Sequence, residues 1–196
     1  MAGLESLIAG LAEAEARHQE AQLDAFLGIE PDICGLVHVK PFTPQMFIEL
    51  SAAGNRFFTG EASVRVADVL QFLWRVSENF DRNDREKRAM FWQALSIVNA
   101  SELRDGVIDY ILRAWAQMPH GEAGRKQSAG AWPSYIVHCI AGAYGWPEDQ
   151  ILNTPFRRLF QYIHRILESR DPEYRQRCPE AMKLRADWLT ARNARN

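Results

Sequence analysis

The sequence predicts an all-α fold: an irregular bundle of about seven to eight helices with a projecting N-terminal helix and a basic C-terminal helix. Three observations predict it. Apolar residues recur at spacings of three and four along most of the chain. Glycine and proline separate the segments that show this spacing. A hydrophobic content of 47% over 196 residues is also enough to form a core.

Residues 1 to 28 predict one amphipathic helix that ends at Gly28. Apolar residues recur near its start, at Leu4, Leu7, Ile8 and Leu11. Its middle is rich in alanine and glutamate and has little to bury. We therefore expect this helix to project from the body or to pack on another chain.

Residues 29 to 170 are the expected helical core domain. A proline-rich beginning contains residues 36 to 39, which predict one short strand. Thr43 precedes a proline, so we expect it to be the N-cap of the next helix. Helices with strong apolar stripes follow between residues 66 and 118. Three tryptophans fall on these stripes and are expected in the core: Trp74, Trp92 and Trp115.

The segment from 118 to 130 is polar and glycine-rich, which predicts a mobile surface loop. After it, the small residues 141 to 143 predict the close approach of a neighbouring helix. The next junction reads NTPF, so Asn153 or Thr154 is expected to cap a helix that begins at Pro155.

Residues 171 to 196 are the third expected unit, a basic helix from about Pro179. From Pro155 to Asn196 the chain has ten Arg or Lys against five Asp or Glu, and the remaining residues have thirteen against twenty. The basic end and the acidic remainder are able to pair within one molecule or between subunits.

No residue pattern indicates a catalytic, cofactor or metal site. The five histidines lack an HExxH motif and zinc spacing with cysteine. Cys139 lies in an apolar helix, where a thiol is usually an inert core group. The loop GEAGRKQS has two residues between its glycines where a phosphate-binding loop needs four. We therefore expect a protein that is not an enzyme and has no cofactor.

The sequence also predicts a cytoplasmic protein. Its three cysteines are far apart and odd in number, which argues against a disulfide framework. The N-terminus lacks the basic and apolar regions of a signal peptide. No apolar run has the length of a membrane span.

The basic C-terminal third is the candidate partner-binding feature. Arg157, Arg158 and Arg165 lie beside the apolar stripe of their helix and either face a protein partner or pair within the chain. The acidic remainder of the chain argues against nucleic acid. Trp188 stands in a polar tail helix, where it either anchors a partner or folds back onto its own chain.

Three stretches together resemble a known group of proteins: CGLVHVKPFTPQMFIELSAAGNRFFTG, ADVLQFLWRVS and AYGWPEDQILNTPFRRLFQYI. They cover roughly residues 33 to 76 and 131 to 167. The combination is similar to small helical proteins of the structural gene clusters of tailed phages and prophages. Several of those are assigned as tail assembly chaperones.

The resemblance implies a chaperone or assembly adaptor that binds the helical tape measure protein in the host cytoplasm. The residues expected to bind a partner are Leu4, Leu7, Leu11, Arg157, Arg158, Arg165 and Trp188. The alternative is a structural virion component, a head–tail connector or tail protein in a symmetric assembly. The acidic and basic regions would then form contacts between subunits of a homo-oligomer.

Overall fold

Helices alone make up the regular structure of the residues that this computed structural model describes, which are 2–61, 63–119, 132–176 and 178–193. The predicted all-α class is confirmed, with nine helices in the described residues where seven or eight were expected. In chain order these are α1 (Ala2–Leu27), α2 (Pro44–Ala52), α3 (Val66–Val76), α4 (Arg85–Leu95), α5 (Ala100–Trp115), α6 (Trp132–Tyr144), α7 (Glu148–Asn153), α8 (Phe156–Arg170) and α9 (Pro179–Asn193).

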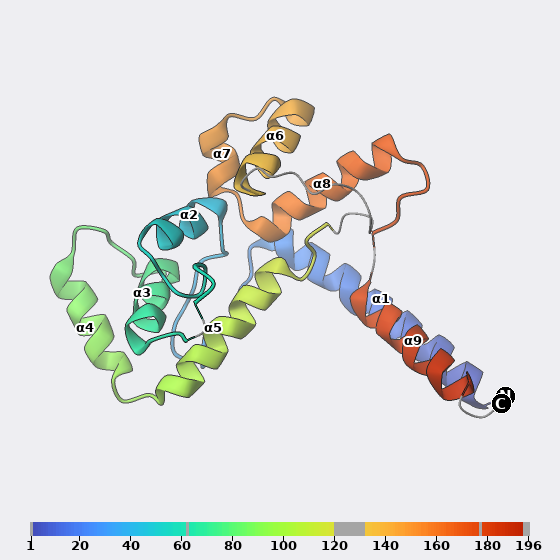
Figure 1. Ribbon diagram of the computed structural model, residues 1–196, viewed down its shortest axis with the longest axis horizontal. Helices are drawn as coiled ribbons and strands as arrows, with labels where there is room; N and C mark the ends of the chain where they lie inside the picture. Colours follow the sequence, from blue (N-terminus) through green and yellow to red (C-terminus); the bar gives the residue numbers. More distant parts are fainter. Residues whose placement is uncertain (1, 62, 120–131, 177, 194–196) are drawn as a thin grey trace.

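α1 and α9 leave the body together and run side by side in opposite directions, so that the start of α1 and the end of α9 lie at the far tip (Figure 1). The sequence predicts them as separate N-terminal and C-terminal units. The structure joins them into one two-helix arm, defined here as residues 4–18 and 179–192. The predicted projecting helix therefore does project, but one side of it is covered by the C-terminal helix of the same chain.

The body contains α2 to α8, and its core is an aromatic cluster around Phe42. The Phe42 ring lies 5.5 Å from the ring of Phe156 and 5.7 Å from that of Phe72, centroid to centroid. Tyr110 also contacts Phe42 and donates its hydroxyl hydrogen to the Lys40 carbonyl oxygen at 2.6 Å. The core therefore ties the segment before α2 to three helices distant in sequence. The apolar stripe of α8, which lies beside its arginines, is buried in this core: Phe156, Leu159, Phe160 and Ile163.

The proline-rich segment before α2 is extended, but its residues form no strand in the described part of the chain. It makes only isolated bridges there, between Ile33 and Val37 and between Val39 and Ser77. The expected N-cap of α2 is confirmed, because Thr43 Oγ1 accepts a hydrogen bond from the backbone N–H of Met46 at 3.3 Å.

Two local predictions were wrong, for Trp92 and for the N-cap of α8, and a third holds only in part. Trp92 is 36% exposed, since α4 packs along one edge of the body and leaves this ring beneath the Arg88 guanidinium. The close approach predicted for residues 141 to 143 holds in part: α6 packs on α8 and Ala141 contacts the core, but no described atom lies within 4 Å of where a Cβ on Gly142 would stand. Pro155 itself is the N-cap of α8, because the side chains of Asn153 and Thr154 donate back to carbonyl oxygens of α7. The predicted loop 118–130 lies, from residue 120 onward, outside the described residues.

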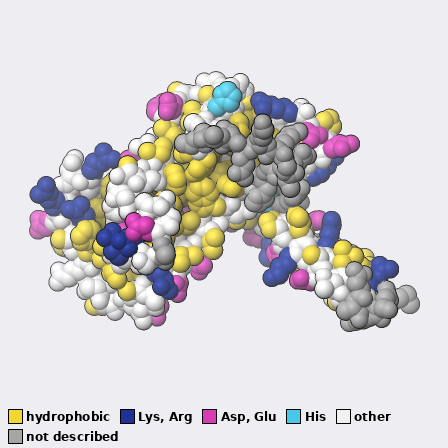
Figure 2. Space-filling view, viewed as in Figure 1, with side chains coloured by type: hydrophobic (Ala, Val, Ile, Leu, Met, Phe, Trp, Pro, Cys, Tyr) yellow, Lys and Arg dark blue, Asp and Glu magenta, His cyan; other side chains and the backbone are white. Residues whose placement is uncertain are grey.

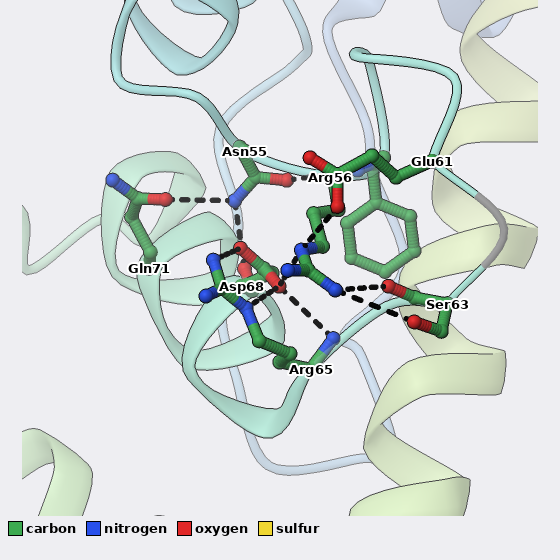
Figure 3. Close-up of polar contacts among 8 residues, drawn as sticks. Asn55, Arg56, Glu61, Ser63, Arg65, Asp68 and Gln71 are labelled. Carbon is green, nitrogen blue, oxygen red and sulfur yellow. Dashed lines mark hydrogen bonds and ion pairs between the residues drawn. The ribbon is translucent and has the colours of Figure 1, made fainter.

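A buried polar cluster holds the start of α3 against the end of α2 (Figure 3). Asn55 is fully buried and donates to the Asp68 carbonyl oxygen at 2.8 Å. The Asp68 carboxylate accepts from the backbone N–H of Arg65 at 2.9 Å and from its guanidinium at 3.0 Å. These hydrogen bonds from Arg65 lower the pKa of Asp68 below its ordinary value. Both buried polar side chains therefore have partners within the cluster, which indicates a structural role.

Candidate partner-binding surface on the helical arm

The seam between α1 and α9 is built from small side chains. Ala14 is fully buried and Ala181 is 5% exposed. A Cβ added to Gly10 would lie 3.7 Å from Leu184 Cδ1, which is ordinary contact. At the base of the seam the Arg17 guanidinium contacts the Glu180 carboxylate at 2.5 Å, with both side chains about half exposed. Small side chains let the two helices approach closely along a narrow seam. Much of the surface of each helix therefore remains uncovered by the other.

Large apolar side chains remain exposed on the arm (Figure 2). Leu4 is 53% exposed and Ile8 58% exposed on α1, while Met182 and Leu189 are 48% and 51% exposed on α9. The other predicted apolar anchors, Leu7, Leu11 and Trp188, are half-buried along the arm.

The exposed apolar residues of the two helices lie on one face of the arm. A cleft at the root of the arm is lined by Glu15 and Gln19 of α1 and by Met182 and Arg185 of α9, so these four residues share that face. Ile8 precedes Glu15 by seven residues, and Leu4 precedes Ile8 by four, which continues the same helical stripe. By the same spacing, Leu189 follows Met182 by seven residues and Arg185 by four. We call this surface the arm face: Leu4, Ile8, Glu15, Gln19, Met182, Arg185 and Leu189.

The cleft at the root of the arm face has a volume of about 480 Å³ and is lined by charged side chains. Arg165, which reaches it from α8, is 74% exposed and pairs with Glu168 at 2.6 Å. Glu15 and Arg185 have no ion-pair partner within the described part of the chain. His18 also lines the cleft, and burial lowers its pKa, which favours the neutral ring. The arm face therefore combines an apolar tip with a polar root.

The two adjacent arginines predicted to face a partner are bound within the chain. Arg157 is 12% exposed and contacts Glu30, which is 4% exposed, with 3.3 Å between Nη1 and Oε1. Its other terminal nitrogen donates to the Ala21 carbonyl oxygen at 2.7 Å. Arg158 donates to the Phe26 carbonyl oxygen and lies over the Phe26 ring. The sequence left two alternatives open for these arginines, a protein partner or pairing within the chain. The structure shows contacts within the chain for both residues, and these contacts fasten the end of α1 to α8.

The structure thus separates the predicted partner-binding residues into two groups. Leu4, Leu7, Leu11 and Trp188 lie along the arm, and Arg165 stands at its root. Arg157 and Arg158 anchor the base of α1. Sequence analysis missed Met182 and Leu189, although their seven-residue spacing on the C-terminal helix is a visible signal.

Within the described residues no three His, Cys, Asp or Glu side chains are grouped as a metal site would require. No described helix has the combined length and apolar character needed to cross a bilayer. The fold and the surface together define an all-α protein with a two-helix arm that carries an exposed apolar face. Comparisons with protein-family models, with curated proteins and with solved structures find no match to this chain.

Proposed function

We propose that this chain is a non-catalytic assembly chaperone or adaptor that holds a helical protein partner against its arm face. The observation that carries the proposal is the exposed apolar tip, with Leu4, Ile8 and Leu189 on one face of a projecting pair of helices. An amphipathic partner helix laid in the groove between two helices buries its own apolar stripe and theirs together. Large apolar patches on a projecting element are typical of protein-interaction sites.

The partner we propose is the tape measure protein of a tailed phage or prophage, bound in the host cytoplasm before tail assembly. Support comes from the resemblance of residues 33 to 76 and 131 to 167 to tail assembly chaperones. A long helical protein with exposed apolar stripes needs a surface of this kind to remain soluble before its own assembly partners cover it.

Co-expression tests the proposal. A tape measure protein from the proposed phage or prophage is produced with the wild-type chain, with Ile8→Glu, or alone, and its soluble fraction is measured. We expect the wild-type chain to raise the soluble fraction and to co-purify, and Ile8→Glu to reduce both effects. Ile97→Glu is the matched control, since Ile97 is 90% exposed on the body, away from the arm. A tape measure protein that is equally soluble alone would refute the proposal.

A second candidate function is a structural virion component, and the charge of the arm favours it. α1 carries five acidic residues and one arginine, and the described part of α9 carries three basic and two acidic residues. Such opposite helices suit contacts between identical subunits. Mass spectrometry of purified particles decides between the two functions, because a structural component is present in stoichiometric amounts and a chaperone is not.

A further inference from the structure

We propose that, without another partner, the arm face pairs with the arm face of a second copy of this chain, forming a four-helix bundle around a two-fold axis parallel to the arm. The inference concerns the occupant of the face in the isolated protein and does not depend on the chaperone role. It follows from three properties of the arm: its apolar layout, its register and its charge.

The apolar layout selects the orientation of the second copy. The tip of the arm face is apolar, with Leu4, Ile8 and Leu189 exposed, and the root is polar, with Glu15 and Arg185. Two arms that point in opposite directions would place the apolar tip of each on the polar root of the other. Two arms that point the same way cover tip with tip and root with root. This orientation buries the most apolar surface against apolar surface, because the root offers only Met182 among the large exposed apolar residues of the arm face.

A two-fold axis parallel to the arm also decides which helices meet. Rotation about such an axis places α1 of one copy against α9 of the other at the same level along the arm. Neighbouring helices of the bundle are then antiparallel, as they are within each arm. α1 is acidic and α9 is basic, so each new contact joins helices of opposite charge.

The register within one arm locates the residues that meet. Gly10 is level with Leu184, and Arg17 is level with Glu180. By this register Ile8 is level with residues 186 to 189, so it faces Leu189 of the second copy. By the same register Glu15 is level with residues 179 to 182, so Arg185 lies about 5–9 Å farther along the arm, a gap that two long side chains can span. The Glu15 carboxylate of each copy thereby gains the Arg185 guanidinium of the other, and neither group has an ion-pair partner among the described residues of its own chain.

The size of the arm face limits the strength of the dimer. α9 has 15 residues. At about 1.5 Å per residue it is about 22 Å long, so a face two helices wide offers on the order of 400 Å² per copy. A standard protein interface buries roughly 800 Å² per partner. The dimer is therefore expected to be weak and to dissociate on dilution, which leaves the face available to a partner that covers more of it.

Sedimentation equilibrium of the purified full chain, from low micromolar to submillimolar concentration, tests the dimer. We expect a reversible monomer–dimer equilibrium for the wild type. Ile8→Glu should raise the dissociation constant at least about tenfold, because it introduces a charge at the apolar contact. Ile97→Glu should leave the constant unchanged, and circular dichroism establishes that each variant is folded. A wild-type chain that remains monomeric throughout, or equal effects of the two substitutions, would overturn the proposal.

Charge reversal tests the arrangement of the copies. Glu15→Lys and Arg185→Glu should each weaken self-association, because like charges then oppose one another at both symmetry-related contacts. Mixing the two variants should restore a dimer of wild-type affinity that contains one copy of each. Failure of the mixture to associate overturns the parallel arrangement. Since no tape measure protein is present, a negative result here leaves the proposed chaperone role standing.

Discussion

Arg157 and Glu30 form a buried ion pair between the first turn of α8 and the segment that follows α1, with 3.3 Å between Nη1 and Oε1. Burial raises the pKa of Glu30 above its ordinary value, and the Arg157 guanidinium opposes this rise. The same guanidinium holds the Ala21 carbonyl oxygen of α1. One side chain thus fastens the base of the arm to the body.

Removing Arg157 is therefore expected to destabilise the protein strongly. Arg157→Leu leaves the Glu30 carboxylate buried without its partner, which should lower the free energy of unfolding by about 3–5 kcal/mol in urea denaturation. The double variant Arg157→Leu with Glu30→Leu should be more stable than the single variant, because no charge remains unpaired.

Arg165→Ala is the matched control for this pair. Arg165 also pairs with a glutamate, but its side chain is 74% exposed, so its removal should cost less than about 1 kcal/mol. Equal losses from the buried and the exposed arginine would contradict the assignment of Arg157 as a structural anchor.

Acid should weaken the polar cluster around Asp68. The hydrogen bonds from Arg65 lower the pKa of Asp68 from its ordinary value of 3.8. Between the folded and unfolded pKa values the unfolded chain binds more protons, so stability rises with pH. This contribution is fully present above about pH 3.8 and is lost as the pH falls through the lower folded-state value.

The melting temperature of the wild type and of Asp68→Asn, measured across this acidic interval, checks the expectation. The wild type should lose its advantage over Asp68→Asn as the pH falls. Two curves that stay parallel across the interval would show that Asp68 titrates alike in the folded and unfolded chain.

Replacing either of two helical glycines with alanine should change the stability of the protein, but in opposite directions. Gly142 lies in α6 with no described atom within 4 Å of the position that a Cβ would take, so Gly142→Ala should stabilise the helix by up to about 1 kcal/mol. A Cβ on Gly106 in α5 would lie 2.8 Å from Cγ2 of Ile33, which is buried. Gly106→Ala should therefore destabilise by about 1–3 kcal/mol through overpacking. Thermal unfolding of both variants measures the difference, and the same sign for both would contradict the close approach at Gly106.

Overpacking the seam should open the arm while the body stays intact. Ala14 is fully buried between α1 and α9, so Ala14→Leu forces the helices apart. We expect faster amide hydrogen exchange in α9 and unchanged exchange in α3 and α8. Ala16→Leu places the same side chain at an exposed position of α1 and should leave α9 protected. Unchanged exchange of α9 in Ala14→Leu would argue that the arm is held by contacts other than this seam.

Local patterns predict much of this fold because their causes lie close together in sequence. Thr43 caps α2 through a hydrogen bond that spans three residues, and the apolar stripe of α8 needs only helical spacing to be recognised. Trp92 shows where this reasoning ends. Its spacing matches a buried stripe, but burial requires a neighbouring element on that side, and the described elements leave this ring partly uncovered.

The candidate site was predictable only in part for the same reason. Leu4 is visible in the sequence as one member of an apolar stripe, yet its place on one face with Leu189 depends on the pairing of helices from opposite ends of the chain. Arg157 and Arg165 are indistinguishable as surface arginines in sequence. Their exposures differ because Glu30 and the end of α1 cover only the first of them.

By itself the sequence determines the all-α class, most of the helices and the absence of a recognisable reaction motif, since each of these depends on spacing or on motifs within short stretches. Only the tertiary structure decides that α1 and α9 form one arm, that this arm exposes a shared apolar face, and that Arg157 and Arg158 are anchors. These features depend on contacts between residues more than a hundred positions apart, such as Arg17 with Glu180 and Arg157 with Glu30. Helical periodicity says which face of a helix is apolar, but packing determines which of those faces remains exposed.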